Sequence, residues 1–268
     1  MTSSPRLRLG KKPAVLDRRT PRLGDMLAAH LPAPPDACDH GAALGAWKLW
    51  RNGDQFSGRG RTMPGLGDCT AVGVASAIRV MTAGRGGEIE LTDDQVVRIY
   101  QDNGYDPDRP ATDQGAVELD VLNRWCEVGY GVGRQAPDVL TAYGAVNPQS
   151  SDGVRRAIAM LGGLYVGLGL PDYALAQQSD WTVRATPAPI AGGHAVFLHG
   201  YDRDWLYLNS WGERKRMDWG FFRAYCDEAY GLLSRDWLDT AGRTPMRESF
   251  DSVAAELRAA EPDAALAA

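Results

Sequence analysis

The chain has 268 residues, which is enough to bury a substantial core as one large domain or two smaller ones. Its hydrophobic fraction of 44% and charged fraction of 24% are ordinary for a folded protein, and a formal charge of −5 gives no general attraction to nucleic acid. Apolar runs such as GLYVGLGL are too short to span a bilayer, so neither nucleic acid nor a membrane is expected as a partner.

Residues 1–45 are predicted to be a basic, proline-rich and flexible extension. The first 22 residues carry seven Lys and Arg side chains against one acid, Asp17, and LPAPPDA is typical of an extended linker. A docking arm for an acidic partner is the alternative interpretation. No apolar stretch follows the basic residues, so an export signal is not predicted and a cytoplasmic location is expected.

Four helices are predicted after Trp47, where the sequence begins to look folded. In GDCTAVGVASAIRVM (67–81) small and apolar residues recur at helical spacing from Cys69 onward. LTDDQVVRIY (91–100) opens with the capping-box pair Thr92 and Gln95. The segments 113–129 and 150–163 complete the set, each ending at glycine.

Strands are predicted in the second half, at 164–170, 194–201 and 205–211. The turn DRD joins the last two as a hairpin. Because helices come first and strands second, the order favours an α+β protein over an alternating parallel sheet. A short amphipathic helix is expected in the tail, 241–268.

The four cysteines are widely separated and form no CxxC pair, so neither a disulfide scaffold nor a zinc site is predicted. No His, Cys and carboxylate cluster has metal-ligand spacing, and no cofactor is expected. Reduced thiols in a cytoplasm are the default expectation.

Cys69 stands at the beginning of a helix, where unpaired N–H groups and the helix dipole stabilise a thiolate. Taken alone, such a cysteine is more often a buried packing residue, and a lone histidine on an apolar strand is more often structural. In a tight hairpin, however, His194 and Asn209 would lie almost opposite each other. An asparagine carbonyl could then orient the imidazole and leave its other nitrogen for the thiol. His199 is expected on the other sheet face.

Four motifs resemble those of the papain-like cysteine peptidase family, in the same order and at similar separations. They are GDCTAVGVASAI, LTDDQVVRIY, DQGAVELDVLNRW and the pair GGHAV with LNSWG, and they cover roughly residues 47–225. The resemblance implies a papain-like α+β domain over about 46–240. Its helical half would cover about 60–150 and its β-rich half about 160–230, and an extended peptide would bind in the cleft between them.

The resemblance also implies roles for single residues. Cys69 would be the nucleophile, His194 the general base and acid, and Asn209 the residue that orients His194. Trp211 would shield the hydrogen bond between His194 and Asn209 from water. Substrate-binding positions are implied at Gln114, Gly115, Gly193 and Trp211.

One position departs from the family pattern. A glutamine six residues before the nucleophile supplies part of the oxyanion hole in that family, and this position is Met63, which cannot donate a hydrogen bond. Gln55 is expected to replace it, with Asn52 as the second choice, because both lie upstream in a glycine-containing loop.

The predicted function is thiol-dependent hydrolysis of peptide or amide bonds through a thioester, acting on a peptide or protein substrate. An acyl transferase or a deamidase would use the same three residues. A catalytically weak binding module, associated with a phage particle, is the alternative from another class. Met63 favours that alternative, and the retention of cysteine, histidine and asparagine together speaks against it. The overall style resembles divergent family members of bacteria and their phages.

Overall fold

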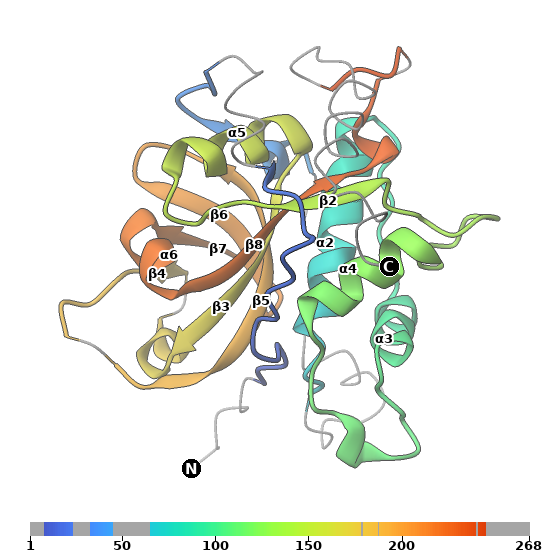
Figure 1. The fold of residues 1–268 in the computed structure, drawn as a ribbon, viewed down its shortest axis with the longest axis horizontal. Helices are drawn as coiled ribbons and strands as arrows, with labels where there is room; N and C mark the ends of the chain where they lie inside the picture. Colours follow the sequence, from blue (N-terminus) through green and yellow to red (C-terminus); the bar gives the residue numbers. More distant parts are fainter. Residues whose placement is uncertain are drawn as a thin grey trace, which may run out of the picture.

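One side of the molecule is mainly helical, and the other is mainly β-sheet with further helices packed on the sheet (Figure 1). The computed structural model describes residues 8–23, 33–44, 65–177, 179–186, 188–239 and 241–244. The α-helices in this part are α2 (Cys69–Gly84), α3 (Asp93–Asp102), α4 (Glu118–Glu127), α5 (Ser151–Leu161) and α6 (Trp219–Tyr225). The strands are β1 (Cys38–Asp39), β2 (Ala142–Ala145), β3 (Leu164–Pro171), β4 (Asp180–Trp181), β5 (Ile190–Tyr201), β6 (Trp205–Ser210), β7 (Glu213–Asp218) and β8 (Cys226–Leu233). The 3₁₀ turns are His40–Ala43, Pro110–Thr112, Asp172–Ala176 and Arg235–Trp237.

The four predicted helices are confirmed. Helix α2 begins at Cys69, and every residue from Cys69 to Thr82 is buried, as its small and apolar composition requires. Helix α3 carries the predicted capping box: Thr92 Oγ1 accepts from the Gln95 backbone N–H, while the Gln95 side chain accepts from the Thr92 N–H.

The strands form one sheet in the order β2-β8-β3-β5-β6-β7-β4, and β1 adds to β5. The predicted hairpin is confirmed, since β5 and β6 pair antiparallel with Leu198 opposite Leu208. Asp202 closes its turn by accepting hydrogen bonds from the backbone N–H groups of Asp204 and Trp205.

Strand β5 has one face toward each of two hydrophobic clusters. Val196 and Leu198 belong to the cluster of the β half, whereas Phe197 belongs to the cluster that contains α2. This alternation is the period of two that a strand imposes on its side chains. Helix α2 therefore packs on the Phe197 face of β5, and this packing brings the start of α2 to the start of the strand.

The N-terminal segment lies between the two halves, where it is drawn in blue (Figure 1). Although a solvated extension was predicted for residues 1–45, parts of this segment pack against the rest of the molecule. Lys11 is 6% exposed and Leu23 is fully buried, and the Ala145 N–H donates to Pro21 O over 2.7 Å. The basic composition of this segment predicted exposure to solvent, because composition does not reveal which distant residues these side chains contact. Most of the predicted tail helix, 245–268, lies outside the described residues.

Candidate active site

Cys69 lies at the first turn of α2, against the backbone of β5. Its side chain is fully buried, and its Sγ accepts a hydrogen bond from the Ala195 N–H over 3.4 Å. Burial raises the pKa of the Cys69 thiol to about 12, against the opposing effect of the backbone N–H groups of Ala195 and Gly10. In this arrangement the thiol is protonated at neutral pH.

His194 immediately precedes Ala195 and is also fully buried. Its Nε2 lies 2.8 Å from Ser210 Oγ, and its ring stacks on Trp211 with centroids 4.5 Å apart at 14°. Trp181 contacts the same ring edge-on at 6.1 Å. Burial, and then the positive charge of Lys215, lower the pKa of His194 to about 3. The imidazole is therefore neutral.

The orienting partner of His194 differs from the expectation. Ser210, not Asn209, bonds the ring, and neither side-chain amide atom of Asn209 has a partner among the described residues. The register explains the difference. Leu198 faces Leu208, so His194 shares a sheet face with residues 208 and 210, while Asn209 points to the opposite face.

The thiol lies beside the backbone of Ala195, the residue next to His194, but the thiol and the imidazole are not bonded to each other among the described residues. Within the described residues, the structure records no hydrogen bond between Cys69 and His194, and His194 Nδ1 has no partner. Trp211 lies over the ring of His194, although the hydrogen bond that it was expected to shield, between His194 and Asn209, is not formed among the described residues. His199, as expected, lies elsewhere, with its Nδ1 3.1 Å from Asp39 Oδ1.

A peptide already occupies the space across Cys69, and it is the chain's own N-terminal segment. The Lys11 N–H donates to Gly193 O over 3.0 Å, on the β side. On the helical side, the Ala116 N–H donates to Gly10 O and the Lys12 N–H donates to Ala116 O, both over 2.9 Å. Two of the predicted substrate-binding positions, Gly193 and Gly115, thus flank a bound peptide.

The contacts on the helical side fall one residue beyond the predicted pair. The Gly115 N–H donates to Tyr100 Oη and the Gln114 N–H to Thr112 O, so the backbone groups that hold the segment belong to Ala116. Gly115 still has a necessary role. Its φ is +74°, and a Cβ there would lie 1.8 Å from Gly10 O.

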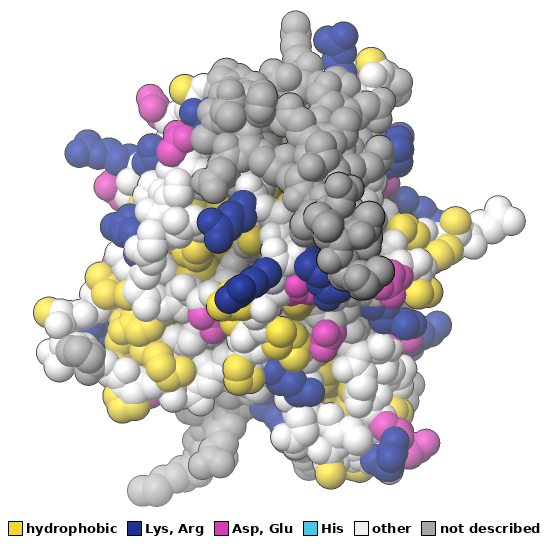
Figure 2. All heavy atoms as spheres, viewed as in Figure 1, with side chains coloured by type: hydrophobic (Ala, Val, Ile, Leu, Met, Phe, Trp, Pro, Cys, Tyr) yellow, Lys and Arg dark blue, Asp and Glu magenta, His cyan; other side chains and the backbone are white. Residues whose placement is uncertain are grey.

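Charges of both signs line the middle of this face. Figure 2 shows Lys and Arg side chains (dark blue) beside Asp and Glu side chains (magenta) where the N-terminal segment runs. Arg8 pairs with Asp113 at 2.8 Å, and Asp113 also accepts from Tyr100 Oη at 2.8 Å. The segment is thus fixed to the helical half by an ion pair as well as by its backbone.

The side chain predicted to act as an oxyanion donor lies outside the described residues. Met63, Gln55 and Asn52 all fall in the range 45–64, so Gln55 remains a prediction. Among the described residues no group of three His, Cys, Asp or Glu side chains could hold a metal ion. In the same part of the chain, no helix is both long and apolar enough to cross a membrane.

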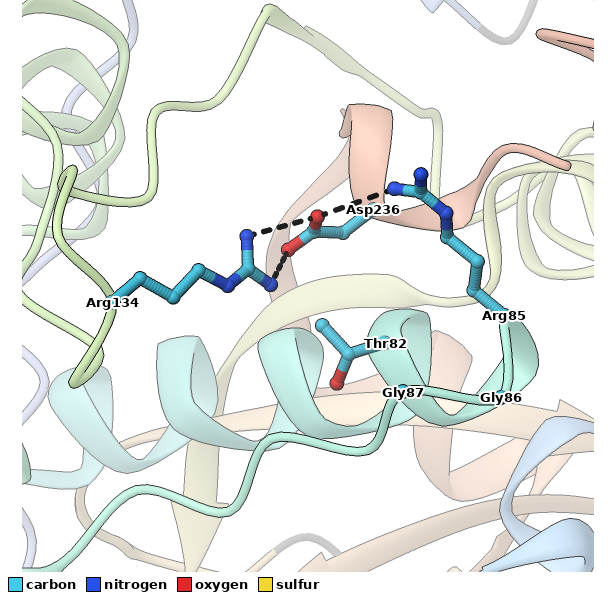
Figure 3. A pocket seen from close by; sticks show the side chains of 6 residues that line it. All are labelled: Thr82, Arg85, Gly86, Gly87, Arg134 and Asp236. Carbon is cyan, nitrogen blue, oxygen red and sulfur yellow. Dashed lines mark hydrogen bonds and ion pairs between the residues drawn. The ribbon is translucent and has the colours of Figure 1, made fainter. Parts of the chain in front are cut away.

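A surface pocket of about 270 Å³ lies at the other end of α2 (Figure 3). Helix α2 has 16 residues, so this pocket is about 24 Å from Cys69 along the helix axis. Asp236 lies between Arg134 and Arg85, with N–O distances of 2.6 and 3.8 Å. The pocket is separate from the candidate site, and its arginines already have an acidic partner.

No protein-family model and no curated protein sequence matches this chain. Solved structures do match it. Xylellain, a cysteine protease from Xylella fastidiosa, aligns with a TM-score of 0.61 and 18% identity over 87% of this chain and 99% of that chain. A procathepsin B from Trypanosoma congolense aligns with a TM-score of 0.55 and 11% identity over 85% of this chain and 86% of that chain. A cysteine protease from Carica candamarcensis has a TM-score of 0.54 and 13% identity, over 75% and 99%. At these identities the likeness concerns the fold.

Proposed function

We propose that this chain, which has the papain-like cysteine protease fold, is a divergent member of that peptidase family and hydrolyses peptide bonds with Cys69 as nucleophile. The observation that carries the proposal is a peptide held across the thiol: Gly193 on one side and Ala116 on the other bond the backbone of residues 10–12. The site thus binds extended chain at the one buried cysteine that adjoins a histidine.

His194 is the general base and acid. Its Nε2–H donates to Ser210, which leaves the Nδ1 lone pair free to take the thiol proton. The thiolate attacks the carbonyl carbon of the substrate, and the tetrahedral intermediate collapses to a thioester as the amine leaves with the proton from the imidazolium. Water, deprotonated by the same imidazole, then cleaves the thioester and restores the thiol.

The described arrangement is the closed form of this enzyme. Neutral Cys69 and neutral His194, both fully buried and not bonded to each other, do not make a thiolate. Departure of the N-terminal segment hydrates both groups. Hydration lowers the thiol pKa and raises the imidazole pKa, so proton transfer between them becomes favourable.

Ser210 takes the orienting role that the family motif gives to Asn209. The oxyanion is held in part by the Cys69 backbone N–H at the start of α2, and Gln55 is proposed as the second donor in place of the family glutamine at Met63. Loss of one such donor costs on the order of 10²–10³ in kcat. With methionine at position 63, a slow enzyme is therefore expected if no other side chain supplies the second donor.

Hydrolysis of fluorescent casein tests the proposal, in the full chain carrying Gly10→Val to displace the segment. Cys69→Ala in that background should abolish hydrolysis, and the matched control Cys126→Ala, on the partly exposed side of α4, should leave it unchanged. Hydrolysis that persists in Cys69→Ala would overturn the assignment of the nucleophile.

One observation favours a second candidate, a catalytically weak peptide-binding module. The site holds peptide while the expected Cys–His hydrogen bond is absent among the described residues. Brief treatment of the Gly10→Val chain with limiting iodoacetamide separates the two: an enzyme is labelled first at Cys69, and a binding module shows no preference among its cysteines. The possible reactions also include acyl transfer and deamidation, which would appear as product in the presence of added amine or glutamine peptides.

A further inference from the structure

Lys11 is buried inside the closed cleft with its ammonium group fully paired. Its side chain is 1% exposed, and its Nζ lies 2.8 Å from Glu228 Oε1 and 2.9 Å from Asp227 Oδ2. Lysine is rarely buried unless it is paired in this way. The side chain thus sits in a formed pocket rather than across a surface.

The walls of this pocket come from both halves of the molecule. Its floor is Gly167 of β3, where a Cβ would lie 2.0 Å from Lys11 Cε, so only glycine leaves room for the stem. Glu228 belongs to β8, and its other oxygen accepts from Tyr230 Oη over 2.9 Å. Glu118, from α4, is fully buried, and neither of its carboxylate oxygens has a partner among the described residues.

The charges in the pocket make it selective. Burial, followed by the charge of Glu228, raises the pKa of Glu118 well above its usual range, which favours the neutral carboxyl. Asp227 and Glu228 each form an ion pair with the Lys11 ammonium group, so two acidic side chains face one cation. An apolar side chain in its place would leave the buried Glu228 charge without a partner, which is strongly unfavourable.

We propose that this pocket, formed by Gly167, Asp227, Glu228 and Glu118, is the side-chain subsite of the peptidase and that it selects substrates with a lysine or arginine. The inference rests on the proposed function. Lys11 reaches the pocket from a backbone bonded to Gly193 and flanked by bonds to Ala116, which are the groups available to any extended peptide in the cleft. A substrate that replaces the segment meets the same carboxylates.

Peptide binding to the Gly10→Val chain tests the pocket. The probes are the hexapeptide Arg-Leu-Gly-Lys-Lys-Pro, which copies residues 8–13, and the same peptide with norleucine at the position of Lys11, a neutral residue that lacks only the terminal ammonium group of lysine. Calorimetry should give about tenfold or more tighter binding of the lysine peptide, as for a charge-assisted hydrogen bond. Glu228→Gln should reduce that ratio to below about threefold. Equal binding of the two peptides, or a ratio that survives Glu228→Gln, would overturn the inference.

A second measurement uses the chain without Gly10→Val, in which the N-terminal segment stays in the cleft. Lys11→Arg should keep Cys69 as slowly alkylated as in the wild type, whereas Lys11→Met should speed alkylation by about tenfold or more, because methionine cannot pair with Glu228. In a Glu228→Gln background the two variants should behave alike. Equal alkylation rates of Cys69 in the wild type and in Lys11→Met would count against a pocket for cations.

Mapping the cut sites in a denatured protein separates this inference from the proposed function. The Gly10→Val chain should leave lysine or arginine at one fixed position relative to the cut. Cuts without that preference would refute the proposed subsite but would still support the proposed peptidase activity. Selective binding without any cuts would support the subsite and refute the peptidase.

Discussion

Gly10 has no side chain at the point where the N-terminal segment passes closest to the start of α2. A Cβ on Gly10 would lie 1.7 Å from Gly67 O, and Gly10 O itself approaches Gly115. Backbone atoms cannot yield as a flexible side chain can, so any larger residue must move the segment. The closure of the cleft thus depends on one glycine.

We expect Gly10→Val to raise the rate of Cys69 alkylation by iodoacetamide by about tenfold or more, because the hydrated thiol ionises more readily. Mass spectrometry of the intact protein and of its peptides measures the rate and the site. Gly131→Val is the matched control, since a Cβ at Gly131 meets nothing within 4 Å. An unchanged rate in Gly10→Val would show that the segment does not protect the thiol.

The structure assigns the orientation of His194 to Ser210, whereas the family motif assigns it to Asn209, and the two assignments predict opposite results. In the Gly10→Val background, Ser210→Ala should lower kcat by about tenfold or more and shift the acidic limb of the pH–rate profile, because the Nε2 partner is lost. Ser210→Thr should restore both. Asn209→Ala should have the smaller effect, and the reverse ranking would return the orienting role to Asn209.

His194 also links stability to pH. Its folded-state pKa of about 3 lies below the unfolded value of 6.5, so the unfolded chain takes up a proton that the folded chain does not. Stability from this residue is full above about pH 6.5 and is lost as the pH falls toward 3. Between pH 8 and pH 5 the loss is about 2 kcal/mol.

The comparison is between the wild type and His194→Gln in urea unfolding at pH 8 and pH 5. The wild type should lose about 2 kcal/mol more than the variant over this interval, because the contributions of other titrating groups cancel. Parallel losses in the two proteins would mean that His194 accepts a proton in the folded state.

Among the elements, those with a strong local signal were predictable from sequence. Helix α2 has small and apolar residues at helical spacing, and α3 has its capping box, so both form where expected. Strand β7 (ERKRMD) is mostly charged and β8 follows α6 without a turn signal, so neither was predicted. Their pairing with distant strands stabilises them, and no local pattern records that pairing.

The candidate site was likewise predictable from sequence only in part. Cys69 and His194 follow from motifs around them, whereas the partner of His194 depends on strand register, which a shift of one residue changes. Lys11 and Asp227 are 216 residues apart in sequence. A basic segment that is buried by such distant acids looks, in sequence, like a solvated arm.

Helix α3 offers a test at the level of one element. Thr92→Ala removes the acceptor for the Gln95 N–H and should destabilise the protein by about 1 kcal/mol in urea unfolding. Arg98→Ala, exposed on the same helix, should change stability by less than about 0.5 kcal/mol. Cys69 alkylation should be the same in both variants. A coupled change in reactivity would indicate that α3 helps to form the cleft.

At the scale of the whole molecule, residues 8–12 connect the helical half to the β half. They bond to Ala116 and Asp113 on one side and to Gly193 and Glu228 on the other. The segment therefore contributes stability as well as closure, contrary to the expectation from its composition.

A chain that begins at residue 13 should lose about 2 kcal/mol or more of its unfolding free energy, because these ion pairs and backbone hydrogen bonds are removed together. Urea unfolding at pH 7 measures the loss. Lys12→Ala, whose side chain is exposed, is the control and should fall within about 0.5 kcal/mol of the wild type. Equal stability of the shortened and full chains would show that the segment rests on the cleft without holding it together.

The occupant of the cleft is covalently attached to the protein that it closes. A free peptide must therefore compete with a local concentration fixed by the length of the connecting chain, which for short flexible connections is on the order of millimolar. Dilution weakens an ordinary inhibitor complex, but it leaves this local concentration unchanged. The fraction of open molecules is thus the same in a crowded compartment and in a dilute extract, and it rises only when the segment is cut, altered or outcompeted.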